Sequence, residues 1–122
     1  ISADNITMNM QRGTGKITLT TGAVEYQPRW WRCGNIVQME VGTKCTEKVA
    51  SGANIAVGKI TKVPKPITKS GVRAVSYYGN NANISYMSPD GTFYARNAGA
   101  DALGNGNDCI GGFTYITDGT ML

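Results

Sequence analysis

Few side chains of this 122-residue sequence could support acid–base or nucleophilic chemistry. The sequence contains eight carboxylates and three cysteines, and it has no histidine. A glycosidase needs two carboxyl groups facing each other across roughly 5–9 Å, and no spacing in the sequence selects such a pair. Without histidine, neither a Ser-His-Asp nor a Cys-His device is available within one chain. Most carboxylates lie in segments rich in turn residues, where aspartate bonds to nearby backbone. We therefore expect no catalytic residue and no enzyme. The carboxylates are Asp4, Glu25, Glu40, Glu47, Asp90, Asp101, Asp108 and Asp118.

Metal and cofactor sites have equally little support. The cysteines Cys33, Cys45 and Cys109 are odd in number and have no CxxC spacing. A zinc site built from them would lack histidine, so we expect reduced, buried thiols instead. The glycine-rich segment 104–106 is not followed by the GKS or GKT of a phosphate-binding loop. The sequence thus predicts neither a metal nor a cofactor.

Aromatic side chains are better candidates for a binding site. Their rings give sugars apolar platforms, and Asn and Asp side chains can add hydrogen bonds. The pairs Trp30-Trp31 and Tyr77-Tyr78 lie in predicted strands, where neighbouring side chains point to opposite faces. One member of each pair should be buried and the other exposed or at a subunit interface. As ligand-binding residues we nominate Trp30, Tyr77, Tyr78 and Tyr86.

The net charge of +4 is compatible with an anionic partner and equally with ordinary solubility. Arg29 and Arg32 flank the tryptophans, where they could stack on aromatic rings or pair with carboxylates. No nucleic-acid motif accompanies the charges, and no apolar run approaches the roughly 18 residues of a membrane span. We expect neither nucleic-acid binding nor membrane insertion. A basic stretch without acidic residues, best explained as a solvated loop face, contains Lys59, Lys62, Lys65, Lys69 and Arg73.

The elements that must position these side chains are predicted to be strands. Isoleucine (10) and valine (8) far outnumber leucine (3), and β-branched residues favour sheets over helices. Between residues 35 and 42, Val37, Met39 and Val41 alternate with Gln38 and Glu40, which is the period of a half-buried strand. Strands are expected over residues 16–20, 24–33, 35–42, 44–49, 54–60, 72–78, 83–87, 92–97 and 109–117.

Turn residues separate these strands. Gly34-Asn35 forms a tight corner, and Ser88-Pro89-Asp90-Gly91 suits a type I turn with a bulge inside a hairpin. Pro28 indicates an edge position or a bulge, because proline cannot donate to a ladder. Residues 61–71 are expected to be an extended connection, and Asp118-Gly119 to end the last strand. The pattern predicts one all-β domain, an antiparallel β-sandwich or jelly roll.

Several segments, taken in order, resemble head domains of phage tail fibres and baseplate receptor-binding proteins. The first is the aromatic and Gly-Asn-containing stretch YQPRWWRCGNIVQMEV, residues 26–41. A glycine turn and strand (52–60), the proline segment ITKVPKPI, the hairpin YMSPDGTFYARNAG and the closing strand GGFTYIT follow in the family's order. The proline segment lacks the leucine and glycine usual there. The similarity covers about residues 22–117.

This resemblance implies a β-sandwich head, residues 22–122, that works as a homotrimer and binds a host-surface glycan or protein without chemistry. Residues 1–21 would form an N-terminal arm and first strand, leading to an upstream region that contacts other tail or baseplate proteins. The protein would be made in the host cytoplasm and act in the virion tail. Because the sequence begins at Ile1, we expect a piece of a longer polypeptide or a processed product.

Other functions remain open at this point. One is a bacterial carbohydrate-binding β-module outside any virion, which would be monomeric. Another is a purely structural fibre or baseplate segment without receptor contact. The last is a tail-spike hydrolase domain, which a panel of polysaccharide substrates would reveal.

Overall fold

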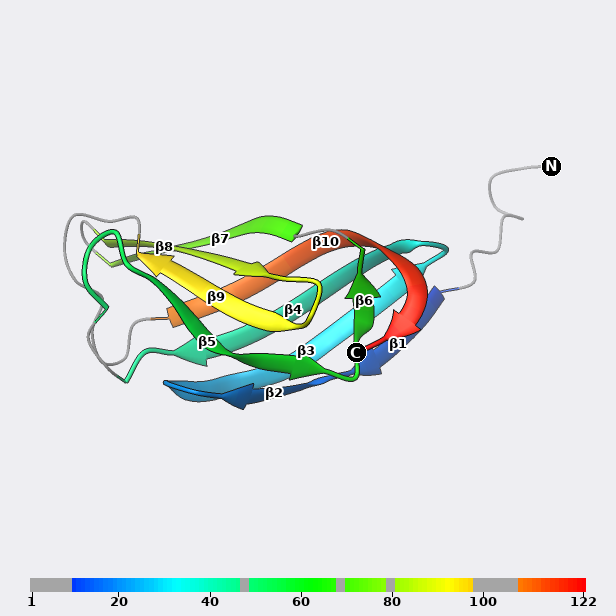
Figure 1. Cartoon of the computed structure of the whole chain (residues 1–122), viewed down its shortest axis with the longest axis horizontal. Coiled ribbons are helices and arrows are strands. Elements are labelled where there is room, and N and C mark those ends of the chain that lie inside the picture. The colour runs from blue at the N-terminus through cyan, green and yellow to red at the C-terminus, as the bar shows by residue number, and fades with distance from the viewer. Residues whose placement is uncertain (1–9, 47–48, 68–69, 79–80, 98–107) are drawn as a thin grey trace.

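The computed structural model describes residues 10–46, 49–67, 70–78, 81–97 and 108–122; for residues 70–78, 81–83 and 108–110 it describes only the course of the backbone. Within these ranges the chain forms ten strands and no helix (Figure 1). The described residues therefore include no helix that could span a membrane. The strands are β1 (Met10–Thr14), β2 (Lys16–Leu19), β3 (Ala23–Cys33), β4 (Ile36–Lys44), β5 (Asn54–Thr61), β6 (Pro64–Pro66), β7 (Ser70–Tyr78), β8 (Asn81–Met87), β9 (Thr92–Asn97) and β10 (Asp108–Met121).

The strands form two antiparallel five-stranded sheets that pack face to face, which confirms the predicted β-sandwich. Sheet A has the order β1-β3-β4-β10-β6, and sheet B the order β2-β5-β9-β8-β7. The chain crosses from sheet A to sheet B at Gly15, between β1 and β2, where the Gly15 N–H donates to the Pro28 carbonyl at 2.8 Å. The expected first edge strand is therefore β1, which pairs with β3 along its whole length.

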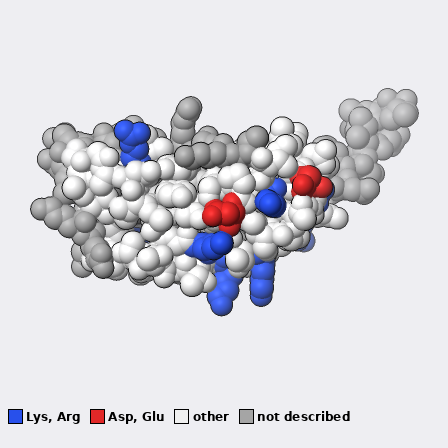
Figure 2. Space-filling model, viewed as in Figure 1, with Lys and Arg blue, Asp and Glu red and all other residues white. Residues whose placement is uncertain are grey.

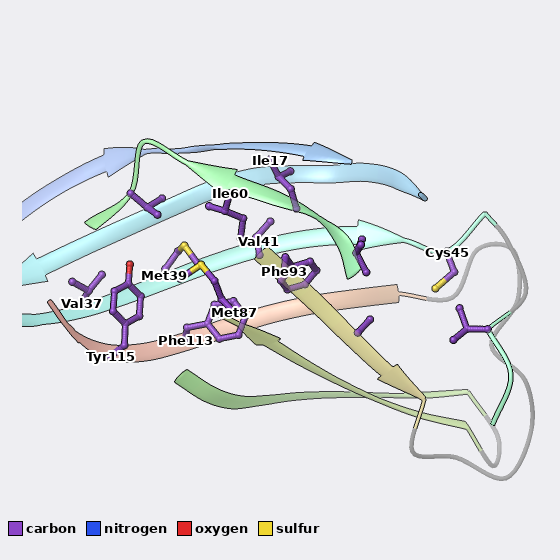
Figure 3. Packing of buried hydrophobic residues seen from close by; sticks show 14 residues of the cluster. Ile17, Val37, Met39, Val41, Cys45, Ile60, Met87, Phe93, Phe113 and Tyr115 are labelled. Atoms are coloured by element: carbon purple, nitrogen blue, oxygen red, sulfur yellow. The ribbon is translucent and has the colours of Figure 1, made fainter. Parts of the chain in front are cut away.

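The core lies between the sheets and follows the alternation of the sequence. Val37, Met39 and Val41 of β4 are fully buried, whereas Gln38 is exposed and Glu40 half-buried, as predicted. Side chains of sheet B face them across the sandwich (Figure 3). The remaining buried members of the cluster are Ile17, Cys45, Val49, Val57, Ile60, Val63, Met87, Phe93, Ala95, Phe113 and Tyr115.

Two aromatic residues join the sheets at the centre of this core. Phe93 from sheet B and Phe113 from sheet A are fully buried and meet edge to face, with ring centroids 6.0 Å apart. Figure 3 shows both rings within the same cluster. Nearby, the buried Tyr115 hydroxyl donates to the Pro64 carbonyl at 2.6 Å and ties β10 to β6, and desolvation raises the Tyr115 pKa well above its usual value.

Both predicted hairpin turns are present. At Gly34-Asn35, Cys33 pairs with Ile36 across a two-residue loop, and Gly34 has a φ of 58°, which suits a turn with glycine at its first central position. At residues 88–91, the Gly91 N–H donates to the Ser88 carbonyl at 2.9 Å. Gly91 has a φ of 89°, which glycine adopts without the steric cost of a side chain.

Pro28 lies in an irregular part of β3, as the bulge alternative predicted, and just beyond the end of the β1–β3 ladder at the Thr14–Arg29 pair. β3 lies between β1 and β4 in sheet A, and its register with β4 shifts between Val24 and Tyr26 and again between Tyr26 and Arg29. The irregular stretch removes the need for an N–H at residue 28, which proline lacks.

Three expected boundaries were wrong. Of the strand expected over residues 44–49, Lys44 belongs to β4, Cys45 and Thr46 have no strand pairing, and residues 47 and 48 lie outside the described residues. β10 does not end at Asp118-Gly119 but reaches Met121, because three residues bulge out between its pairs with Pro66 and Pro64. The connection 61–71 contains β6, and the residues from Ser70 onward already belong to β7.

Candidate functional site

A hollow opens on sheet A where β1 lies beside β3. Its volume is about 310 Å³, and its lining consists of Arg12, Gly13, Thr14, Arg29, Trp30 and Trp31. The strand register explains its shape: Arg12 pairs with Trp31, Gly13 with Trp30, and Thr14 with Arg29. Paired residues project to the same side of a sheet, and successive pairs alternate between sides. The first and third pairs therefore form walls on the outer face, and the backbone of the Gly13–Trp30 pair forms the floor.

Trp30 supports this floor from the inner face. Its indole packs against the core, and its Nε1 donates to the Lys62 carbonyl at 3.2 Å. The indole lies across β1 because residue 13 is glycine: a Cβ there would come within 2.6 Å of the ring. The spacing of the two walls is that of residues two apart on a strand, roughly 6–7 Å.

Arg29 is held in place by an aromatic neighbour. Its guanidinium carbon lies 5.9 Å from the centre of the Tyr26 ring, within cation–π range. The Tyr26 ring in turn covers Gly42 of β4, which has no side chain to displace it. Tyr26, Arg29 and Trp31 thus form a line of planar groups along β3, with Arg12 beside Trp31 on β1.

The hollow is positively charged. Arg12 and Arg29 are both exposed, and within the described ranges neither forms an ion pair with a carboxylate. The ion pair present there joins Lys44 Nζ to Glu25 Oε1 at 3.8 Å, beyond the hollow. Glu40 is the register partner of Arg29 on the β4 side, but it does not line the hollow.

The four nominated residues are not brought together. Trp30 lies on the inner face of sheet A, whereas Tyr86 lies on sheet B, where it stacks on Tyr94 at 4.8 Å and bonds to the Asn54 side chain. In the β7–β8 pair, Tyr86 lies opposite Gly71, while Tyr77 and Tyr78 lie at the other end, opposite Ala82 and Asn81. The side chains of Tyr77 and Tyr78 fall outside the described residues.

Sequence reasoning overlooked Trp31 and Arg12, although a signal for Trp31 was present. The two-residue Gly34-Asn35 turn sets Cys33 opposite Ile36, and this pair fixes the register of the two strands. Counting back from the turn, Trp31 lies opposite Gln38 and Trp30 opposite Met39. Gln38 was expected outside and Met39 inside, which assigns Trp31 to the outer face and Trp30 to the core. No comparable signal existed for Arg12, because the neighbour of β3 on its other side is set by tertiary structure.

A row of exposed apolar side chains crosses sheet A next to the hollow. We call it the apolar row: Met10, Cys33, Ile36, Ile116 and Ile67, one from each strand or, for Ile67, from the residue directly after β6. Met10, Ile36, Ile116 and Ile67 are 60%, 59%, 55% and 50% exposed, and Cys33 is half-buried. The row lies one outward-facing pair beyond Arg12 and Trp31. Apolar surface of this continuity is typical of an interaction face.

The remaining charged groups are dispersed. Lys59 belongs to sheet B and Lys65 to sheet A, so the basic stretch of the sequence does not form one face; Lys69 and the Arg73 side chain lie outside the described residues. In the view of Figure 2, basic and acidic side chains are interspersed over uncharged surface, and basic ones project along the lower edge, where Figure 1 places β2. Among the described residues, no group of three acidic, Cys or His side chains could hold a metal ion.

Two aspartate side chains stabilise turns by local hydrogen bonds. Asp90 accepts hydrogen bonds from the Ser88 hydroxyl and, at 3.0 Å, from the Thr92 N–H; these bonds lower its pKa from 3.8 to about 2. Asp118 accepts from the hydroxyl and N–H of Thr120, which likewise lower its pKa. Both carboxylates are occupied by local backbone and side-chain donors.

This geometry predicts a small acid-side loss of stability. Because the folded-state pKa of Asp90 is depressed, its contribution is complete above its unfolded pKa and is lost as the pH falls through the folded pKa of about 2. We expect the urea midpoint to fall between about pH 4 and pH 2. Asp90→Asn keeps the shape of the side chain but removes its titration. It should therefore reduce the decrease of the free energy of unfolding between about pH 4 and pH 2, by less than about 1 kcal/mol for so exposed a group. An unchanged slope in Asp90→Asn would contradict this role.

Comparisons of the chain with protein-family models, with curated proteins and with solved structures find no match.

Proposed function

We propose that this chain is the non-catalytic receptor-binding head of a phage or prophage tail fibre or baseplate, and that it attaches to a saccharide on the host cell surface. The hollow beside Trp31 is the observation that carries the binding part of the proposal. It combines an aromatic side chain on the outer face, a glycine floor and polar walls, which is the composition of a site for a small polar ligand with an apolar ring face. The placement in a virion tail rests on the order of segments in the sequence.

Three of the carboxylates in the described ranges are held in local contacts, which suits a binding role. Asp90 and Asp118 are engaged in their own turns, and Glu25 pairs with Lys44. The hollow itself is lined by arginine, threonine, glycine and tryptophan, none of which is an acid–base pair of the glycosidase type.

The apolar row supports assembly into a homotrimer. A side chain such as Ile36 that is 59% exposed gains free energy when a neighbouring subunit covers it. Since the hollow lies directly beside the row, its opening would sit at the border of a subunit contact, and three copies would give avidity to weak individual sites. Light scattering on a sizing column tests this: a mass of three chains supports the trimer, and a monomer across micromolar concentrations removes it from the proposal.

Binding through the hollow predicts a large effect of Trp31→Ala. Adhesion of the fluorescently labelled chain to a panel of bacterial strains should weaken roughly tenfold or more, because aromatic anchors dominate small binding sites. Tyr86→Ala, which removes an aromatic ring from sheet B, is the matched control and should adhere normally. Loss of adhesion in Tyr86→Ala with normal adhesion in Trp31→Ala would move the site to sheet B. Lack of adhesion of the unaltered chain to any strain would contradict the proposal.

A further inference from the structure

We infer that the hollow on sheet A binds an acidic saccharide, in which a sugar ring lies against Trp31 and a carboxylate or phosphate ester lies between Arg12 and Arg29. This inference rests on the proposed function and specifies its ligand class. It follows from the relative positions of the two guanidinium groups, from the absence of an ion pair to either of them among the described residues and from the aromatic ring beside them.

The two arginines stand diagonally across one floor. Arg12 is the register partner of Trp31, and Arg29 is two residues from Trp31 on the same strand. Diagonal neighbours of this kind in an antiparallel pair lie about 7–8 Å apart, and their Cβ atoms somewhat less, a span that arginine side chains reach across. An anionic group above the Gly13–Trp30 floor can therefore accept hydrogen bonds from both guanidinium groups.

An anion would also relieve an unfavourable charge arrangement. Within the described ranges neither guanidinium forms an ion pair, and Glu40, the neighbour of Arg29 on β4, does not line the hollow, so two like charges face it. Charge-assisted hydrogen bonds from arginine to carboxylate or phosphate are among the stronger polar contacts, and the bidentate geometry suits both anions. The Arg29 guanidinium carbon also lies 5.9 Å from the centre of the Tyr26 ring, within cation–π range.

The aromatic wall selects a ring-bearing ligand over a bare anion. Trp31 is half-buried and presents indole surface next to Arg12, while the exposed Thr14 places a hydroxyl on the opposite wall. A sugar offers a C–H face to the indole and hydroxyls to threonine. A hollow of about 310 Å³ is at the low end of small-ligand sites, which favours a short saccharide unit.

Single-stranded nucleic acid shares an anionic group and a stacking ring, but the surface fits it less well. Such ligands are bound along a basic groove that follows successive phosphates with several stacking platforms. The hollow has only one indole on the outer face. The next outward-facing pair of β1 and β3 toward the Gly34-Asn35 turn is Met10–Cys33, which belongs to the apolar row and carries no arginine.

The test measures binding of four probes to the full chain by titration calorimetry: polygalacturonate, a phosphomannan, neutral dextran and oligothymidylate. We expect one of the two acidic polymers to bind more tightly than dextran and oligothymidylate, with an affinity that falls as salt is raised. The preferred polymer then tells carboxylate from phosphate. Arg12→Gln and Arg29→Gln should each weaken that binding roughly tenfold. The control Arg96→Gln, an equal loss of charge at an exposed position on sheet B, should stay within about twofold of the unaltered chain.

Failure of this inference differs from failure of the proposed function. If dextran binds as tightly as both acidic polymers, or if the double variant Arg12→Gln/Arg29→Gln keeps full affinity, the acidic ligand is refuted. The saccharide-binding function still stands in that case, provided that Trp31→Ala abolishes cell adhesion. If oligothymidylate binds most tightly and the arginine variants lose that binding, the ligand is nucleic acid and both proposals are overturned.

Discussion

Phe93→Ala should lower the free energy of unfolding by about 3–5 kcal/mol, a large part of the roughly 5–15 kcal/mol typical of a domain. Phe93 is fully buried, and its ring meets Phe113 edge to face across the two sheets. Truncation removes the buried ring, leaves a cavity and breaks an aromatic pair that adds about 0.5–1.5 kcal/mol. Urea unfolding followed by circular dichroism, at one fixed protein concentration, measures the loss.

Two control variants make this expectation specific. Phe93→Leu retains most of the apolar volume and should cost less than Phe93→Ala. Val24→Ala truncates a side chain that is 39% exposed and should change stability little. A loss below about 1 kcal/mol in Phe93→Ala would mean that the sheets are not joined through this ring.

Ile36→Glu and Ile116→Glu should each dissociate the proposed trimer while leaving the domain folded. These neighbours in the apolar row lie on paired strands and are 59% and 55% exposed, so each monomer accommodates the change at its surface. At a covered subunit contact, by contrast, the same glutamate would be buried without a partner, at a cost of several kcal/mol per site. Light scattering should report single chains, and the urea midpoint of the monomer should be nearly unchanged.

The matched control is Val24→Glu, which introduces the same charge at an exposed apolar side chain of β3 outside the row. It should retain the mass of the unaltered assembly. If Ile36→Glu and Ile116→Glu both keep that mass, the apolar row is not the subunit contact, even if the protein is a trimer.

Much of the fold could be predicted because it depends on short-range patterns. The alternation around Met39 placed one face of β4 in the core, and the glycines at 34 and 91 marked turns whose backbone they adopt readily. The boundaries at Lys44 and Met121 were missed because neighbouring strands extended the pairing beyond local turn signals. Where a partner strand supplies hydrogen bonds, an Asp-Gly pair is absorbed as a bulge rather than ending the strand.

The sequence by itself determined most of the strands, the buried face of β4 and, through the Gly34-Asn35 turn, the register that sets Trp31 opposite Gln38 and Trp30 opposite Met39. Only the tertiary structure decided the order of the strands in the sheets. The position of β1 beside β3 brings Arg12 next to Trp31. The position of β10 between β4 and β6 aligns Ile116 with Ile36 and Ile67. Alternation is a property of local backbone geometry. Strand order depends on contacts between residues far apart in sequence, and loop-closure entropy discriminates only weakly among the possible orders.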